Sequence, residues 1–411
     1  MTAPDLGTGD AAVSRPLLRP ELAAVFAALD ASGARWVMYR GALDRPGGDV
    51  DVLVAPDDLD RAQAAIESAG FLRRRAPEHE PHRLLLRRAH DGWFVVDLLA
   101  VVEAAGGRSR TLPVLELLLD RAVPDDDGVQ RLRDDDRDWL ALVRAVHRGP
   151  ASLTGVPPID SPLVPAIDSV LGAGSAAAGA AAAEKALGGD DAPLRALLDA
   201  WRPLLKPVAG GPAAKARKVR EALDWGAPGR RGVSVAVLGP DGAGKSTLVE
   251  GLRDSVPMAV SIRYLGVFRQ DPHEPLWKRV PGVGLGAKLV TLRWRSTKGA
   301  VDVRRGRLLL YDRHVVDALL RPGKPTARAR ISYTLLEHSC PAPDLFVVLD
   351  APGEVMFARK GEHTVELLEE RRQRYLELQG RYPNVAVVDA TQDADAVRRD
   401  VEDLVWRTWS R

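Results

Sequence analysis

A short segment near the middle of the chain has the residue types and the spacing of a phosphate-binding loop. Gly239, Gly244, Lys245 and Ser246 match the pattern G-x-x-x-x-G-K-S/T. The apolar run VSVAVL comes before the match and a helical pattern follows it, as the motif requires. Glycines let backbone N–H groups surround phosphate oxygens, Lys245 can reach the β- and γ-phosphates, and Ser246 can bind Mg²⁺. We therefore predict a nucleotide site, with ATP and Mg²⁺ as the cofactors.

Three further loop residues belong to the predicted nucleotide site: Asp241, Gly242 and Thr247. Asp241 could orient a hydroxyl group of an acceptor, or it could stabilise the turn. The sequence alone leaves both roles open.

Two acidic residues later in the chain could serve the metal, because each ends an apolar, strand-like run. Asp312 ends RLLLYD and Asp350 ends LFVVLD, and Arg313 follows Asp312 to give YDRH. This Asp-Arg pair resembles the one that follows the third strand in thymidylate kinases and related nucleotide kinases. The resemblance implies that Asp312 lies near the metal and the transferring phosphate, and Arg313 near the phosphate of the acceptor. We interpret Asp350 as a strand-end cap.

The resemblance continues in order along the rest of the chain. PDLFVVLDAPGEVMFARK resembles the strand and helix before the family's lid, GEHT the lid itself, and ELLEERRQRYLEL the helix after it. It implies four lid candidates, of which we expect roughly one or two to contact phosphate: Arg359, Lys360, Arg371 and Arg372. The segment VAVVDATQDADAVRRDVEDLVW resembles the last strand, the adenine-side loop and the terminal helix, with Asp389, Ala390 and Thr391 in the loop.

The stretch from Ser261 to Arg307 is where this family binds its acceptor. It contains eleven Lys or Arg residues against three Asp or Glu residues. Such a charge balance suits a small anionic acceptor that carries phosphate, and it suits solvated helix faces equally well. Arg263 and Tyr264 lie in this neighbourhood, but the family's acceptor-side positions have no clear match here.

A second group of carboxylates lies in the N-terminal part. Asp49 and Asp51 are two residues apart in the strand-like segment GGDVDVLV, so both project from one face. Asp97, in WFVVDLL, could come from a neighbouring strand. Three converging carboxylates could hold two Mg²⁺ ions for nucleotidyl transfer.

This arrangement resembles the DNA polymerase β-like nucleotidyltransferase superfamily, over roughly Ala34 to Val102. The superfamily has Gly-Ser or Gly-Gly after its first strand, whereas this chain has Arg40 and Gly41 there. His82 could approach the same site, or it could be an ordinary core or surface histidine.

The elements that must position these residues can be located from their hydrophobic periodicity. Helical spacing around Leu22–Leu29 is followed by strand-like WVMY, VDVLV, HRLLL and WFVVDLL, with a helix in DDLDRAQAAIESAG. Residues 151–230 read as alanine-rich helical pieces broken by proline and glycine. We therefore predict an α/β or α+β nucleotidyltransferase-like domain over 1–150, a helical connector over 151–230, and an α/β kinase-like domain with a helix-flanked parallel sheet over 231–411.

Composition narrows the setting. The 411 residues carry a formal net charge of only +2, which gives no global field for nucleic acid. The single cysteine, Cys340, excludes an internal disulfide and indicates a reducing compartment. The N-terminus lacks the pattern of a secretory signal, and no segment is long and apolar enough for a bilayer. We expect a cytoplasmic protein with no membrane partner.

Together these observations predict an ATP-dependent kinase that transfers the γ-phosphoryl group to a small acceptor, a nucleoside monophosphate such as dTMP being the first to try. One alternative is a nucleotidyltransferase that acts through Asp49, Asp51 and Asp97, with the loop-containing domain as an accessory. Another is a nucleotide-gated binding or regulatory protein. The oligomeric state, including a homodimer, is left open.

Overall fold

The computed structural model describes residues 18–75, 82–103, 111–205, 229–266, 283–318, 320 and 327–411. The chain forms two compact units, each made of segments that are not continuous in the sequence. The first unit comprises Met1–Ala69, Ala100–Ala104 and Thr111–Leu204, and the second comprises Gly70–Leu99, Ala105–Arg110 and Leu205–Arg411. The predicted segments 1–150, 151–230 and 231–411 are continuous, whereas the second unit takes in a piece of the N-terminal part.

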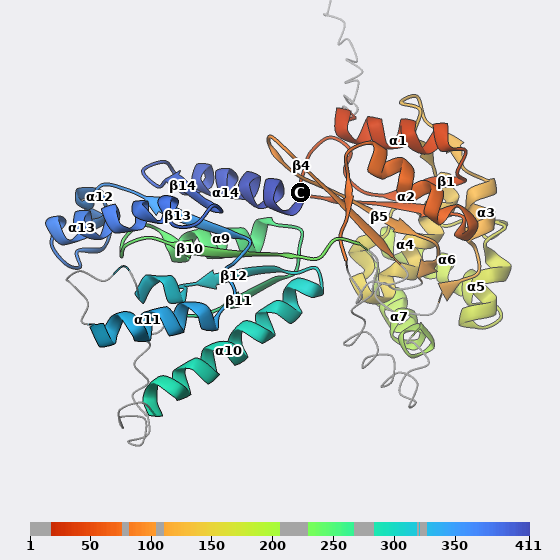
Figure 1. The fold of residues 1–411 in the computed structure, drawn as a ribbon. Helices are drawn as coiled ribbons and strands as arrows, with labels where there is room; N and C mark the ends of the chain where they lie inside the picture. Colours follow the sequence, from red (N-terminus) through yellow and green to blue (C-terminus); the bar gives the residue numbers. More distant parts are fainter. Residues whose placement is uncertain are drawn as a thin grey trace, which may run out of the picture. The chain divides into compact units, whose positions relative to one another are not determined.

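The first unit combines a small sheet with helices. Strands β1 (Trp36–Arg40) and β2 (Asp49–Val54) pair antiparallel, and β1 also pairs in parallel with β9 (Gln130–Arg131). Helices α1 (Pro20–Ser32) and α2 (Leu59–Ser68) pack against each other (Figure 1). The strand order within this unit is β2-β1-β9-β8, with β8 at Val123–Pro124. This part is α+β.

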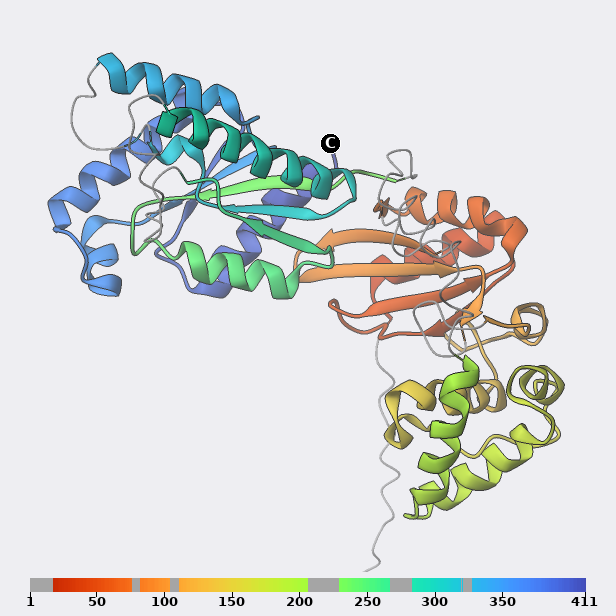
Figure 2. The same cartoon turned by 90° about the horizontal axis from the view of Figure 1, so that it is seen from below.

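Helices dominate the rest of the first unit. They are α3 (Leu115–Asp120), α4 (Asp134–Arg148), α5 (Val164–Leu171), α6 (Ser175–Leu187) and α7 (Ala192–Leu205), and Figure 2 shows α4 to α7 gathered together in yellow and green. The α6–α7 packing is close, since a Cβ on Gly179 would lie 2.6 Å from the ring of Trp201. Among the described residues no single helix could span a bilayer, and only the bent pair α5 and α6 has the required length and apolar composition.

The second unit is built on a five-stranded parallel sheet, which confirms the predicted α/β class for this part. Its order is β11-β12-β10-β13-β14, with all four neighbouring pairs parallel. The strands are β10 (Val233–Leu238), β11 (Val260–Arg263), β12 (Leu308–Asp312), β13 (Leu345–Asp350) and β14 (Val385–Asp389). All six residues of β10 are buried, as expected of a central parallel strand covered on both faces.

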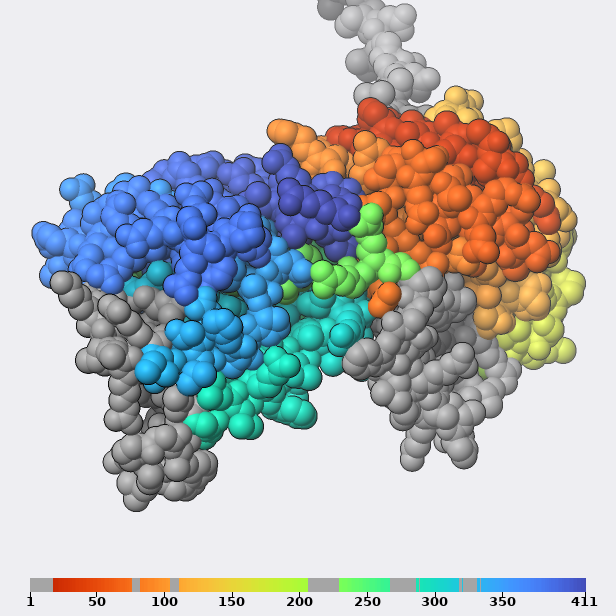
Figure 3. Space-filling view, in the orientation of Figure 1, coloured from red at the N-terminus to blue at the C-terminus, as the bar shows by residue number. Residues whose placement is uncertain are grey.

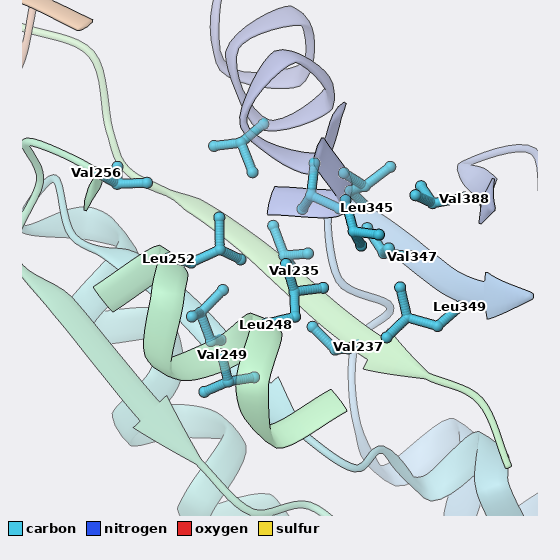
Figure 4. Close-up of a cluster of buried hydrophobic side chains, with 14 of the residues drawn as sticks. Val235, Val237, Leu248, Val249, Leu252, Val256, Leu345, Val347, Leu349 and Val388 are labelled. Atoms are coloured by element: carbon cyan, nitrogen blue, oxygen red, sulfur yellow. The ribbon is translucent and has the colours of Figure 1, made fainter. Parts of the chain in front are cut away.

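Helices cover both faces of this sheet. They are α9 (Lys245–Ser255), α10 (Val283–Arg304), α11 (Ala327–Ser339), α12 (Gly353–Lys360), α13 (Val365–Leu376) and α14 (Ala394–Trp409). Val235 and Val237 point to the face where α9 and α14 pack, and Figure 4 shows them with Leu248 and Leu252 of α9. Ala236 and Leu238 point to the other face, with residues of α10 and α11. The alternation along one strand thus divides the core into two layers.

Three strands from the N-terminal part also belong to the second unit: β3 (Leu72–Arg73), β4 (Arg83–Ala89) and β5 (Gly92–Leu99), which pair antiparallel. Figure 3 shows this orange hairpin beside the dark blue α14. The indole N–H of Trp93 donates to Glu402 Oε2 at 3.2 Å, and its ring meets Trp406 edge-on at 5.8 Å between centroids. The buried Arg88 guanidinium lies 3.4 Å from Glu402 and 3.2 Å from Asp403. The loop-containing half therefore depends on residues from the N-terminal part for its packing.

We predict that Trp93→Ala lowers the free energy of unfolding of the second unit by about 3–5 kcal/mol, because the change removes a buried ring and leaves Glu402 with one donor fewer. Urea unfolding followed by far-UV circular dichroism measures this loss. Trp294→Ala is the matched control, because Trp294 on α10 is 62% exposed. Equal unfolding midpoints for Trp93→Ala and wild type would contradict the packing role.

Candidate phosphate-binding site

The predicted phosphate-binding loop connects the end of β10 at Leu238 to the start of α9 at Lys245. Gly239 and Gly242 have φ angles of 146° and 87°, in the region that glycine adopts readily. A Cβ on Gly242 would lie 2.4 Å from the carbonyl oxygen of Met356 in α12. Glycine is therefore required here both by the backbone conformation and by the close approach of α12.

The side chain of Lys245 folds back over the loop. Its ammonium donates to the carbonyl oxygens of Gly239 at 2.8 Å and Pro240 at 2.7 Å. Burial lowers the pKa of Lys245 to about 8, although the nearby Asp241 carboxylate favours the charged form. A desolvated ammonium of this kind gains most from an anion bound in the loop.

Asp241, at the tip of the loop, is the point where several cationic side chains meet. Arg313 donates to its Oδ1 at 3.0 Å, Arg371 of α13 donates to its Oδ2 at 3.3 Å, and His363 lies 3.5 Å from Oδ2. Burial alone would raise the pKa of Asp241, but the charges of Lys245 and Arg313 outweigh it and hold that pKa below its usual value. The structure thus brings two of the predicted phosphate-binding arginines to the loop.

Two of these residues adopt an uncommon backbone conformation. Arg313 has a φ of 90° and His363 a φ of 67°, and both lack the freedom of glycine. Such strain persists only where the surrounding structure holds it, and it clusters at functional sites.

Atoms of Asp241, Glu362 and His363 also lie within 4.8 Å of one another, a spacing that suits a metal ion. The arginines already paired with Asp241 disfavour a further cation there.

Asp312 lies at the end of β12, directly beside the strand that leads into the loop. It pairs in register with Val237, two residues before Gly239. Among the described residues, none forms a hydrogen bond or ion pair with its carboxylate. Ser246 is exposed in the first turn of α9. A hydroxyl and a carboxylate are the hard oxygen ligands that Mg²⁺ prefers, so these residues fit the predicted metal.

The remaining lid candidates, Arg359, Lys360 and Arg372, have different surroundings. Arg372 donates to both oxygens of Asp350, at 2.5 and 3.0 Å, and also to Glu369 at 3.0 Å. Asp350 therefore holds α13 against the end of β13. Lys360 pairs with Glu362 at 3.0 Å, and Arg359 is exposed at the C-terminal end of α12. Of the four lid candidates, only Arg371 bonds to the loop.

A cavity of about 240 Å³ opens beside the loop. Arg359 lines it together with residues of the loop, α9, β13, the turn after β14 and α14. These are Ala243, Gly244, Thr247, Leu248, Leu349, Ala390, Gln392, Ala394 and Val397. The predicted Asp389 and Thr391 do not line it but shape the turn, since Thr391 donates to Asp389 through its backbone N–H at 2.8 Å and its hydroxyl at 2.6 Å. The apolar lining suits a flat ring.

Sequence reasoning missed a second carboxylate near the loop, Asp317. It accepts hydrogen bonds from the Tyr375 hydroxyl at 2.9 Å and from the backbone N–H of His314 at 3.1 Å. Burial raises its pKa, although those bonds and the charge of Lys245 act in the opposite direction. In the sequence, Asp317 lies five residues after Asp312, and this spacing matches no motif that would mark it as a site residue.

Part of the predicted acceptor region lies outside the described residues, namely 267–282. In the described part, Arg263 donates to Asp302 through two nitrogens, at 2.9 and 2.5 Å. The backbone carbonyl of Tyr264 accepts from Arg295 at 3.4 Å. Arg263 is thus held by a carboxylate of α10.

The N-terminal carboxylates are distributed over both units. Asp51 of β2 is buried and paired with Arg40, and Asp49 is exposed at the start of the same strand. Asp97 lies on β5 in the second unit, where its Oδ2 is 3.4 Å from Nδ1 of His82. Asp49 and Asp51 thus lie in the first unit and Asp97 in the second, and the two-metal site of these three residues stays a prediction.

No family model matches the chain. Among solved structures, it is similar to deoxyadenosine kinase from M. mycoides with bound dATP, at 15% identity over 42% of this chain and 97% of that one, with a TM-score of 0.30. It is also similar to thymidylate kinase from Candida albicans, at 19% identity over 43% of this chain and 92% of that one, with a TM-score of 0.34. At these scores the likenesses carry no inference about activity, which must come from the residues of this chain.

We predict that Asp241→Asn lowers the free energy of unfolding of the ligand-free protein by about 1–3 kcal/mol, because Lys245, Arg313 and Arg371 lose their shared counter-ion. Added pyrophosphate should restore most of the loss, since it supplies negative charge at the same point. Urea unfolding with and without pyrophosphate measures both effects. Asp254→Asn is the matched control, because that exposed carboxylate on α9 pairs with its neighbour Arg253. A loss that pyrophosphate leaves unchanged would count against the phosphate site.

Proposed function

We propose that the second unit is an ATP-dependent phosphotransferase that acts on a small anionic acceptor, with a nucleoside monophosphate such as dTMP as the first candidate. One observation carries the proposal. Lys245, Arg313 and Arg371 come from three different elements and meet at a glycine loop before a helix N-terminus. Positive groups converging at such a loop suit a polyphosphate.

The residues have distinct roles in this proposal. The nucleotide base occupies the cavity of about 240 Å³, where the guanidinium of Arg359 can lie against its ring. The phosphates lie on the backbone N–H groups of the loop and at the start of α9, and Lys245 contacts the β- and γ-phosphates. Ser246 and Asp312 would hold Mg²⁺, directly or through water. That ion, when bound, neutralises the negative charge on the phosphate oxygens.

Arg313 and Arg371 support transfer by exchanging the carboxylate of Asp241 for a phosphate group. Without nucleotide, Asp241 keeps Arg313 and Arg371 close to the place where the transferring phosphoryl group would lie. A phosphate offers more charge than a carboxylate, so these side chains can turn to it at little cost. Arg313 then contacts the acceptor phosphate, Arg371 contacts the transferred group, and Asp241 is released to accept a hydrogen bond from an acceptor hydroxyl.

The purified full chain incubated with γ-labelled ATP, Mg²⁺ and a panel of nucleoside monophosphates, sugars and sugar phosphates tests the proposal. We expect transfer to one class of acceptor, and a loss of at least about a hundredfold in Lys245→Met and Asp312→Asn. The matched control is Glu250→Gln, an exposed change on α9.

Other outcomes of this experiment point elsewhere. Stoichiometric ATP binding without transfer to any acceptor would contradict the kinase and favour a nucleotide-gated binding protein. A parallel reaction with α-labelled ATP tests nucleotidyl transfer. Label transferred there, and lost in Asp49→Ala, would place the principal chemistry in the N-terminal part.

We also predict that nucleotide binding near pH 8.5 takes up a fraction of one proton. The pKa of Lys245 is about 8 in the free protein, and a bound polyphosphate raises it. Affinity should therefore fall as pH rises above about 8, by up to roughly tenfold per unit. Calorimetric titrations in two buffers with different ionisation enthalpies measure the uptake, which Lys245→Met should abolish. Identical enthalpies in both buffers would show that Lys245 does not change protonation.

A further inference from the structure

The first unit contains a cavity of about 260 Å³ that is lined by Arg40 and Gly41 and by none of the carboxylates predicted to bind metal ions. The end of β1, the strand β9 and helix α4 enclose it. Four arginines line it, and the described lining residues include no carboxylate: Arg40, Arg131, Arg137 and Arg144. A concave site with this composition suits an anion.

The backbone at the end of β1 brings Arg40 and Gly41 to the lining of this cavity. The register between β1 and β2 shifts between Met38 and Arg40, where the strand carries a bulge. Gly41 follows with a φ of 135°, and a Cβ on it would lie 2.6 Å from the carbonyl oxygen of Asp49. Bulges of this kind redirect side chains at strand ends and are frequent beside binding sites.

Three of the four arginines are tethered by carboxylates that lie outside the cavity lining. Arg40 pairs with the buried Asp51, and Arg137 pairs with Asp134 on its own helix. Arg131 lies 2.8 Å from Asp125 and 2.6 Å from Asp127. These contacts fix the arginines in place and offset their charges.

Arg144 differs from the other three. Its guanidinium lies over the ring of Tyr39, 5.0 Å from the centroid, and its Nε donates to the carbonyl of Leu140 at 3.2 Å. Among the described residues, no carboxylate forms an ion pair with it. Burial lowers the pKa of Arg144; Tyr39 and Asp51 act in the opposite direction, but the charges of Arg40 and Arg148 lower it further. A half-buried cation without a counter-ion is costly, and a bound anion would remove that cost.

We propose that this cavity binds a small organic phosphate, with the phosphoryl group on Arg144 and Arg40 and the organic part against Tyr39 and Met38. The volume of about 260 Å³ is below that of most ligand sites, so it admits a body of about one ring. Binding requires no metal ion, because Arg40 already balances the charge of Asp51. The site differs from the phosphate-binding loop in its residues and in its unit.

Calorimetric titration of the full chain tests this site, with Lys245→Met as the background so that the phosphate-binding loop contributes less. The probes are ribose 5-phosphate, ribose and inorganic phosphate, each in the presence of EDTA. We expect ribose 5-phosphate to bind, inorganic phosphate to bind more weakly, and ribose alone not to bind.

Arg144→Gln should weaken the binding of ribose 5-phosphate at least about tenfold, because a charge-assisted hydrogen bond is lost. Arg61→Gln is the matched control, since Arg61 on α2 is exposed and does not line the cavity; we expect a change of less than about twofold. Arg137→Gln, at an exposed position, provides a second test that does not disturb the packing on Tyr39.

Three results would overturn the proposal: affinity unchanged in both Arg144→Gln and Arg137→Gln, binding that appears only with Mg²⁺, or no binding of either phosphate probe. The Lys245→Met background separates this outcome from a failure of the kinase. Far-UV circular dichroism of each variant shows whether a loss of binding reflects a loss of fold, and in that case the Arg137→Gln result decides.

Discussion

The positive charge of Lys245, held in a partly buried place, is the constraint on which the functional end of the second unit depends. Carbonyl oxygens of Gly239 and Pro240 hold the ammonium, and the carboxylate of Asp241 lies close to it. The same carboxylate draws in Arg313 and Arg371, so one negative charge organises side chains from three elements. Three cationic side chains thus converge beside one carboxylate, so an anion that entered the loop would meet positive charge already in place.

The sheet that carries this loop is stabilised by contacts between α14 and a hairpin from the N-terminal part of the chain. Helix α14 covers β10 with its apolar residues and turns Glu402 and Trp406 toward the β4–β5 hairpin. A buried arginine, Arg88, lies between Glu402 and Asp403, where the carboxylates offset the cost of its burial. A contact between residues 309 positions apart therefore supports the helix that closes one side of the cavity beside the loop. Nothing in the local pattern of either segment reveals such a contact.

Local patterns did predict the loop, the strand before it and the position of Asp312, because each is determined by a few consecutive residues. They could not separate Arg371 from Arg372. Successive helical residues point about 100° apart, so Arg371 meets the loop while Arg372 meets Asp350, and the rotation of α13 is fixed only by tertiary packing. Asp317 was missed for the same reason, since Tyr375 from a distant helix makes it part of the site.

Arginine–carboxylate pairs occur in both units, but their burial gives them different consequences. Asp241 keeps 19% of its side chain exposed, so it can lose Arg313 to a phosphate and be solvated in exchange. Asp51 is 3% exposed, and the loss of Arg40 would leave a buried charge without a partner. Arg40 must therefore stay with Asp51 while it contacts a ligand. Among the four arginines of this cavity, Arg144 forms no ion pair with a described carboxylate, so a ligand in the proposed site could engage it without breaking an existing pair.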